Sequence, residues 1–110
     1  QTIARGLNPE KAIFLLEEGA IEIINIQDFT GKSKTAQLRL KGRIIGRKGK
    51  VRMMLEKLTN TEIVVYGKTV TIIGETEDVL LAKTSVERLL QGAPHGNVYR
   101  WLEKQIAHKF

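Results

Sequence analysis

One stretch decides the fold: GRIIGRKGKVRMMLEKL, at residues 42–58. Two glycines, Gly46 and Gly49, flank an Arg-Lys pair in its middle. The apolar residues that follow recur at helical spacing, at Val51, Met54, Leu55 and Leu58. The segment after Gly49 is therefore predicted to be a short helix, and the glycine turn before it is the feature to explain.

The glycines and the cations between them support two interpretations. In the first, Gly46 ends one helix, Gly49 helps to start the next, and Arg47 and Lys48 are merely exposed; a lone G-x-x-G favours this view. In the second, the turn binds phosphate. A helix N-terminus carries about half a positive charge and unpaired N–H groups, and glycines leave no side chain to hold an anion away from them.

Two other phosphate-binding loops do not fit these residues. A Walker loop needs a glycine five positions before Gly49-Lys50, and Ile44 occupies that position. The G-x-G-x-x-G dinucleotide pattern is also absent. We therefore expect the phosphate of a polymer rather than that of a nucleotide.

The positive charge of the chain is concentrated around this turn. The 110 residues carry a net charge of +6. From Phe29 to Leu55 there is no acidic residue, and that stretch holds Lys32, Lys34, Arg39, Lys41, Arg43, Arg47, Lys48, Lys50 and Arg52. The remainder has 9 basic residues and 12 acidic ones, a net of 9 − 12 = −3. A block of one sign predicts a polyanionic partner.

Composition limits the other classes of function. The length suits one domain, and no apolar run approaches the roughly 20 residues that a membrane span needs. Cysteine is absent, which fits a reducing compartment, and we expect a cytoplasmic protein. No metal-ligand spacing surrounds His95 or His108, and no nucleophile–base pair or carboxylate cluster is evident. We expect neither metal nor cofactor and no enzymatic activity. The start at Gln1 suggests a piece of a longer protein.

The N-terminal third predicts a helix and a strand. Asn8-Pro9-Glu10 combines a cap, a first-turn proline and an acid, and Gly19 can end the helix. Ala20 to Phe29 reads as a strand with a slip in alternation near Ile23-Ile24. Thr35 to Ile45 is ambiguous, because its apolar residues fit either period.

The C-terminal half is clearer. Glu62–Tyr66 and Thr69–Ile73 are β-branched strands, and the Gly67-Lys68 pair between them suits a type II′ hairpin. Thr76 caps a helix that Gly92 ends, and Asn97 caps a last helix. Met53 and Met54 are expected to pack, and Trp101 is expected to anchor the last helix. The apolar stripes of these two helices are Val79, Ala82, Val86, Leu89 and Leu90, then Val98, Trp101, Leu102 and Ile106.

The sequence IIGRKGKVRMMLEKLTNTEIVV, followed by TVTIIGETEDV, resembles a type I KH domain. The resemblance implies an α+β fold of order β-α-α-β-β-α. A three-stranded antiparallel sheet is covered by helices on one face, and the ambiguous segment becomes the first KH helix. We expect one domain over 1–110, with an N-terminal helix at 1–20, the KH core at 21–91 and a C-terminal helix at 92–110.

The flanks, ARGLNPEKAIFLLEEGAIEIINIQDF and LLQGAPHGNVYRWLEK, resemble the second KH domain of the Dim-two family, also called partner of Nob-one. This family resemblance implies an archaeal or eukaryotic pre-rRNA processing factor of ribosome biogenesis. It implies binding near the 3′ end of small-subunit rRNA. It also implies three protein partners: the Nob-one endonuclease, the rRNA dimethyltransferase and the alpha subunit of initiation factor two.

The candidate RNA-binding residues follow from the turn and its surroundings. Gly46, Arg47, Lys48 and Gly49 would grip phosphate. Lys41, Arg43, Lys50 and Arg52 would line the phosphate path. Ile45, with Ile63 or Val64, would form an aliphatic floor for bases, because aromatic residues make up only 5% of the chain. The alternative function is a protein-interaction module that docks processing factors or an initiation factor subunit, and a nuclease is the third possibility.

Overall fold

The structure is a computed structural model that describes residues 19–109. The N-terminal helix expected at residues 1–20 lies almost entirely outside the described residues. The elements follow in the order β1 (Ala20–Asn25), α2 (Gln27–Thr30), α3 (Lys34–Ile45), the 3₁₀ turn η2 (Arg47–Gly49), α4 (Lys50–Thr59), β2 (Glu62–Tyr66), β3 (Thr69–Gly74), α5 (Thr76–Leu90) and α6 (His95–Lys109). None of the helices in this range combines the length and apolar character that crossing a bilayer requires.

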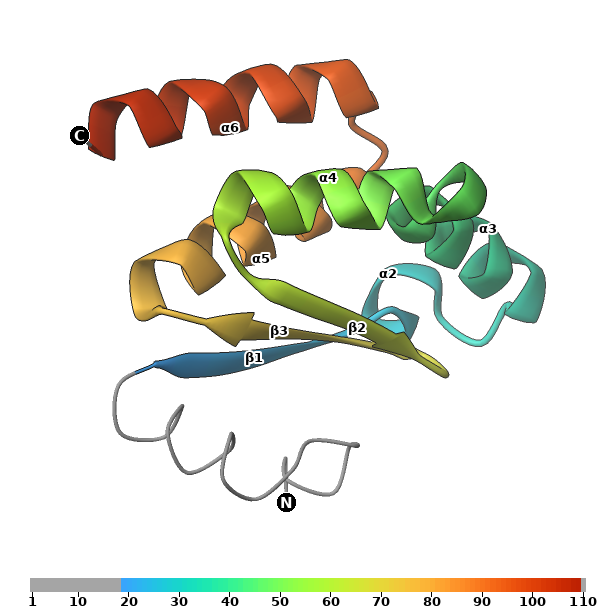
Figure 1. Cartoon of the computed structure of the whole chain (residues 1–110). Coiled ribbons are helices and arrows are strands. Elements are labelled where there is room, and N and C mark those ends of the chain that lie inside the picture. Colours follow the sequence, from blue (N-terminus) through green and yellow to red (C-terminus); the bar gives the residue numbers. More distant parts are fainter. Residues whose placement is uncertain (1–18, 110) are drawn as a thin grey trace.

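The three strands form an antiparallel sheet in the order β1-β3-β2, so β2 is an edge strand. Helices α3, α4 and α5 lie on one side of the sheet, and α6 lies across α4 and α5 (Figure 1). The predicted α+β KH fold and its element order are confirmed. Thr35–Ile45, which composition left undecided, belongs to a helix.

Strand β1 differs from the prediction in two ways. It ends at Asn25 rather than near Phe29, because the Asn25 side chain accepts the N–H of Gln27 at 2.9 Å and a short helix begins there. The expected slip is also absent: β1 pairs with β3 without interruption from Ala20 to Asn25. Ile24 therefore faces the helices and is buried, while Ile23 faces the other side and is 42% exposed.

The core lies between the sheet and the helices. The three strands and helices α3 to α6 all contribute buried aliphatic side chains, which include Ile24, Ile44, Leu55, Ile63, Val70, Ile72, Val79, Val86, Leu89, Val98 and Leu102. Burying one such side chain stabilises the fold by roughly 1.5–3 kcal/mol relative to leaving it exposed. The stripes predicted on α5 and α6 are confirmed. Met54 is not part of the core: it is 42% exposed, and Met53 is 49% exposed, so the packing predicted for both is wrong.

The last two helices have other capping residues than predicted, because each of them begins earlier in the chain. Helix α5 begins at Thr76 itself, with Glu75 in the capping position. Helix α6 begins at His95, so Asn97 lies in its first turn, where its side chain accepts from Arg100. Trp101 anchors α6 as expected: the Arg88 guanidinium carbon lies 4.4 Å from the centroid of its ring.

Candidate nucleic-acid interface

The turn between α3 and α4 depends on a glycine at position 46. Gly46 ends α3 with φ 76° and ψ 175°, a conformation that is essentially restricted to glycine. Its N–H bonds to the Gly42 carbonyl at 2.8 Å. A Cβ built on Gly46 would lie 2.3 Å from Cγ2 and 2.8 Å from the backbone N of Val51. The first turn of α4 therefore approaches the α3 end closely enough that no side chain fits between them.

The other half of the turn is built from left-handed residues. Lys48 has φ 56° and ψ 27°, and Gly49 has φ 76° and ψ 13°. Such a conformation costs a non-glycine residue about 1–2 kcal/mol. Lys48 adopts it at the tip of an exposed turn, and a Cβ at Gly49 would meet nothing within 4 Å. The turn thus reverses the chain within a few residues and turns its backbone outward.

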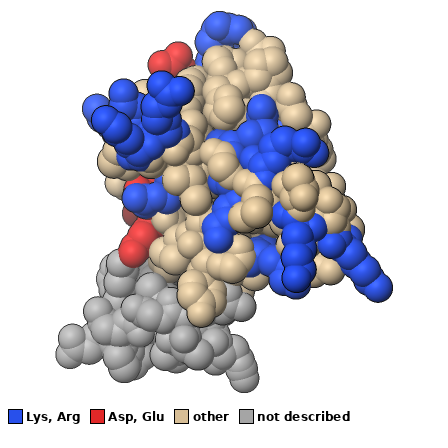
Figure 2. All heavy atoms as spheres, turned by 90° about the vertical axis from the view of Figure 1, so that its right-hand side faces the viewer, with Lys and Arg blue, Asp and Glu red and all other residues tan. Residues whose placement is uncertain are grey.

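The electrostatics of this turn favour an anion. Arg47, Lys48 and Lys50 are exposed. No side chain caps the N-terminus of α4, and the first turn of this helix contains no acid. Figure 2 shows the end of the molecule that carries α3, the α3–α4 turn and the β2–β3 turn: Lys and Arg are spread over this face, while the visible acids lie at one margin. The helix terminus and the cations therefore attract the same ligand.

An aliphatic groove opens beside the turn. It has a volume of about 310 Å³ and is lined by Ile45, Arg52, Ile63, Val64 and Val65. We call this set the aliphatic groove. Ile63 is 1% exposed, so its side chain forms the floor rather than a rim. The groove brings residues from α3, α4 and the edge strand β2 together, next to the cationic turn.

The edge of β2 supplies backbone groups to this groove. The N–H of Ile63 donates to Oε2 of Glu56 at 2.7 Å, and Nη1 of Arg52 donates to the Ile63 carbonyl at 3.4 Å. Arg52 and Glu56 are themselves paired at 3.1 Å. Because backbone groups alternate in direction along a strand, those of Val65 also point away from β3. The groove therefore combines aliphatic contact with a backbone donor and acceptor at the edge of β2.

The predicted site residues fall into four groups, the last of which is Arg43 alone. Gly46, Arg47, Lys48, Gly49 and Lys50 form the turn, while Ile45, Arg52, Ile63 and Val64 line the groove. Lys41 lies on α3 and lines a separate hollow near the β2–β3 turn.

Arg43 is separated from all of these. Its Nε donates to the Leu89 carbonyl at 3.0 Å, and its Nη2 donates to the Ala93 carbonyl. The guanidinium thus ties α3 to the connection between α5 and α6.

Known proteins are similar to this chain in sequence and in fold. A family model for the second KH domain of PNO1 proteins, described as a eukaryotic-type KH domain (KH-domain type I), matches residues 20–107. This chain belongs to the type I KH family. A KH domain-containing protein from Methanocaldococcus jannaschii is 45% identical over 106 residues, which are 96% of this chain and 46% of that protein. The pre-rRNA-processing protein pno1 of Aspergillus fumigatus is 33% identical over 104 residues, 94% of this chain and 41% of that protein.

A solved structure supports the same relationship. A chain in the crystal structure of an a/eIF2alpha–aDim2p–rRNA complex from Pyrococcus horikoshii OT3 is 48% identical, with a TM-score of 0.78. The match covers 94% of this KH domain and 56% of that chain. The domain spans less than half the length of the two relatives named above.

Sequence reasoning missed several residues that line the two hollows, among them Val65, Leu38 and Lys68. Val65 belongs to the aliphatic groove, and Leu38 and Lys68 line the hollow that contains Lys41. A signal for Leu38 was present: Leu38, Lys41 and Ile45 follow at intervals of three and four, which places them on one helix face. No local pattern marks Lys68, because it reaches this surface through the β2–β3 turn.

Proposed function

We propose that this chain is the RNA-binding KH module of a ribosome-assembly factor. In this proposal it binds single-stranded pre-rRNA near the 3′ end of small-subunit rRNA. The observation that carries the proposal is the Gly46–Gly49 turn, which exposes backbone and cations at the mouth of the aliphatic groove. The relatives support it, since one is a pre-rRNA-processing protein and another was solved in a complex with rRNA.

Each part of the interface has a separate task in this proposal. The N-terminus of α4, with Arg47, Lys48 and Lys50, binds phosphates. Ile45 and Val64 contact the faces of the bases, and the backbone of Val65 bonds to a base edge. Phosphate contacts hold the strand in position, while contacts to bases carry what sequence preference there is. The residues supply binding groups only, so we assign the chain no catalytic step. We also propose that it acts in the cytoplasm.

Single-strand preference tests this function. RNA readers of this kind bind unpaired bases, and a groove beside one helix end admits one strand. We expect a single-stranded oligonucleotide with the sequence of the small-subunit rRNA 3′ end to bind more tightly than the same sequence in a duplex. Its log–log salt slope should be roughly −2 to −4, using about 0.7 per phosphate contact. Equal affinity for the duplex, or no salt dependence, would contradict the proposal.

A second candidate function is protein docking, supported by a different surface. A hollow between α5 and α6 is lined by Leu80, Leu81 and Trp101, and Leu80 is 52% exposed. The solved complex with a/eIF2alpha makes the alpha subunit of initiation factor two the first partner to test. The Nob-one endonuclease and the rRNA dimethyltransferase are the other proposed partners. A Leu80→Glu variant that keeps RNA affinity but loses affinity for one of these proteins would support this role.

A further inference from the structure

The hollow between α5 and α6 lies outside the candidate nucleic-acid interface. It has a volume of about 310 Å³ and is lined by Glu77, Leu80, Leu81, Thr84, Trp101 and Gln105. We call it the α5–α6 hollow. None of these residues lines the aliphatic groove or the hollow that contains Lys41.

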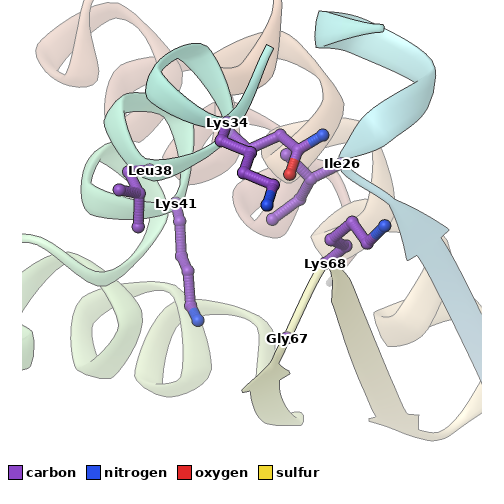
Figure 3. A pocket seen from close by; sticks show the side chains of 7 residues that line it. Ile26, Lys34, Leu38, Lys41, Gly67 and Lys68 are labelled. Carbon is purple, nitrogen blue, oxygen red and sulfur yellow. The ribbon is translucent and has the colours of Figure 1, made fainter. Parts of the chain in front are cut away.

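The charge of the α5–α6 hollow does not suit RNA. Its lining contains no lysine or arginine, and its one charged residue is Glu77, which is exposed. The hollow that contains Lys41 shows the contrast, because Lys34, Lys41 and Lys68 lie around it (Figure 3). A phosphate chain would meet three cations there and an acid in the α5–α6 hollow. A protein is therefore the better occupant of the α5–α6 hollow.

Leu80 and Trp101 offer apolar contact in this hollow. Leu80 is 52% exposed, although Val79 and Ala82 beside it on α5 are completely buried. Trp101 packs partly against the core and reaches the hollow from α6. Tryptophan is among the residues that most often carry the energy of a protein interface. An exposed leucine beside it adds apolar surface for a partner to cover.

Both walls of the hollow are helices, which limits the form of the partner. Helices bond their backbone groups internally, so an extended peptide would find no strand edge to pair with. Glu77, Leu81, Thr84 and Arg88 follow at intervals of four, three and four, so they occupy one face of α5. Eleven steps from Glu77 to Arg88 span about 16 Å, the length of about three helical turns. A third helix can pack along this face.

The two ends of this face carry opposite charges. Glu77 lies in the first turn of α5, and Arg88 lies in the last, with its guanidinium carbon 4.4 Å from the centroid of the Trp101 ring. Both residues are exposed, and neither forms an ion pair within residues 19–109. A guanidinium that stacks on an aromatic ring can still bond to a carboxylate. The ends of the face therefore match a base at Glu77 and an acid at Arg88.

We propose that the α5–α6 hollow binds an amphipathic helix of a protein partner. Apolar side chains of that helix, spaced by three and four residues, cover Leu80 and Trp101. A basic residue of the helix pairs with Glu77, and an acidic residue about three turns away pairs with Arg88. The inference rests on the docking role proposed above and adds the class of segment that is recognised.

A defined peptide provides the test. The 110-residue chain is titrated with a model peptide of about 18 residues, which is long enough to form a helix. The peptide carries leucines at intervals of three and four, lysine near one end and glutamate near the other. A control peptide has the same composition, with leucines at every second position, so that no helix face gathers them. The first peptide should bind roughly tenfold more tightly than the control.

A pair of variants locates the peptide. Leu80→Glu should reduce the affinity for the helical peptide by roughly tenfold, because it places a charge among the apolar contacts. Its matched control is Leu38→Glu, which makes the same change at a leucine on α3 that is 70% exposed. Both side chains are exposed, so both variants should stay folded. Leu38→Glu should leave the peptide affinity unchanged, and Leu80→Glu should leave the affinity for single-stranded RNA unchanged.

A charge exchange tests the end of the face at Glu77. Glu77→Lys should weaken binding of the helical peptide by about two- to fivefold, the range of an exposed ion pair. A peptide with glutamate at both ends should bind this variant better than it binds the unaltered chain. Melting temperatures, measured in parallel, show that the variants are folded.

Four results would each overturn the inference. They are equal affinity for the two leucine patterns, an equal effect of Leu80→Glu and Leu38→Glu on the peptide, no recovery in the charge exchange, and a loss of RNA affinity in Leu80→Glu. The last result would make the hollow an RNA surface.

Failure of the docking role has a different signature. If Leu80→Glu weakens binding of an intact partner protein while the helical peptide has no advantage over its control, the docking role stands and only the helix is wrongly assigned. If Leu80→Glu leaves the affinity for all three proposed partner proteins unchanged, the docking role fails, and this inference falls with it.

Discussion

Gly46 and Val51 approach so closely that a Cβ on Gly46 would lie 2.3 Å from Cγ2 of Val51. The same Cβ would be 2.8 Å from the Val51 backbone N, which cannot move without shifting α4. The glycine is therefore required by the packing of α3 against α4, in addition to its backbone conformation. Position 49, three residues later, favours glycine only because its φ is positive, since a Cβ there would meet nothing within 4 Å.

The two glycines should therefore differ in their contribution to stability. We expect Gly49→Ala to cost about 1–2 kcal/mol, the price of a left-handed conformation with a side chain. Gly46→Ala should lower the free energy of unfolding by more than about 2 kcal/mol, because the clash with Val51 adds to the cost of a backbone conformation that alanine rarely adopts. Urea unfolding measures both free energies.

A third glycine supplies the control for that comparison. Gly42 lies inside α3, has no positive φ, and a Cβ there would meet nothing within 4 Å. Gly42→Ala should stabilise the domain by about 0.5–1 kcal/mol, as expected in a helix interior. Equal losses for Gly46→Ala and Gly49→Ala would show that the approach to Val51 is relieved at little cost.

Lys48 should separate stability from binding. It is one of two described non-glycine residues with positive φ, the other being Asn60. Lys48→Gly relieves this conformation and should stabilise the domain by up to about 1 kcal/mol. It should also weaken RNA binding, since it removes a charge from the turn. Thermal melting and RNA titration on the same variant check both effects, and a loss of stability would contradict the strain assigned to Lys48.

Arg43 should behave as a structural residue. Its guanidinium bonds to the carbonyls of Leu89 and Ala93, so Arg43→Ala leaves both acceptors without this partner. Hydrogen bonds to charged groups contribute about 1.5–3 kcal/mol, and we expect a loss of that size. Arg39→Ala removes the same charge from an exposed site on α3 and should cost less than about 0.5 kcal/mol.

RNA affinity distinguishes the two possible roles of Arg43. If Arg43 served the phosphate path, its replacement would weaken binding by folded protein far more than Arg39→Ala does. We expect the two variants to lose similar, small amounts of affinity at temperatures where both are folded. A large loss specific to Arg43→Ala, with little change in unfolding free energy, would return Arg43 to the RNA site.

The sequence predicted the order of elements because most segments carry a single hydrophobic period. The exception, Thr35–Ile45, was ambiguous for a physical reason that the structure identifies. Leu38 and Leu40 alternate as in a strand, but Leu38 is 70% exposed and plays no part in the core. This exposed leucine disguised the helical pattern, which ends in the buried Ile44.

For the candidate site, sequence reasoning could group residues only where the signal is local. The Gly46–Gly49 turn lies within four residues, and the structure places those residues together. Arg43 could not be distinguished from neighbouring cations, since its acceptors lie 46 and 50 residues away in the chain. Lys68 joins the basic face through a turn, and no spacing in the sequence relates it to Lys41.

The charge of the turn should be separable from the fold. Arg47 and Lys48 are exposed, and neither side chain is part of the core. Changing both to Asp keeps Gly46 and Gly49 in place and shifts the charge by −4, from +2 to −2. Aspartate tolerates a left-handed backbone better than most residues, and an acid near a helix N-terminus is favourable by about 0.3–1 kcal/mol. The melting temperature and circular dichroism should therefore change little.

RNA affinity of the same double variant should fall by roughly two orders of magnitude or more, because phosphate contacts carry much of the binding energy. Two carboxylates would stand where phosphate oxygens approach the start of α4, so repulsion adds to the lost attraction. Lys57→Asp/Lys104→Asp is the matched control, with the same charge change at exposed positions that line neither the aliphatic groove nor the hollow that contains Lys41. Unfolding of the Arg47→Asp/Lys48→Asp variant would make the turn a structural element. A loss no greater than that of the control would place the RNA elsewhere, with the stretch from Lys32 to Lys41 the first region to test.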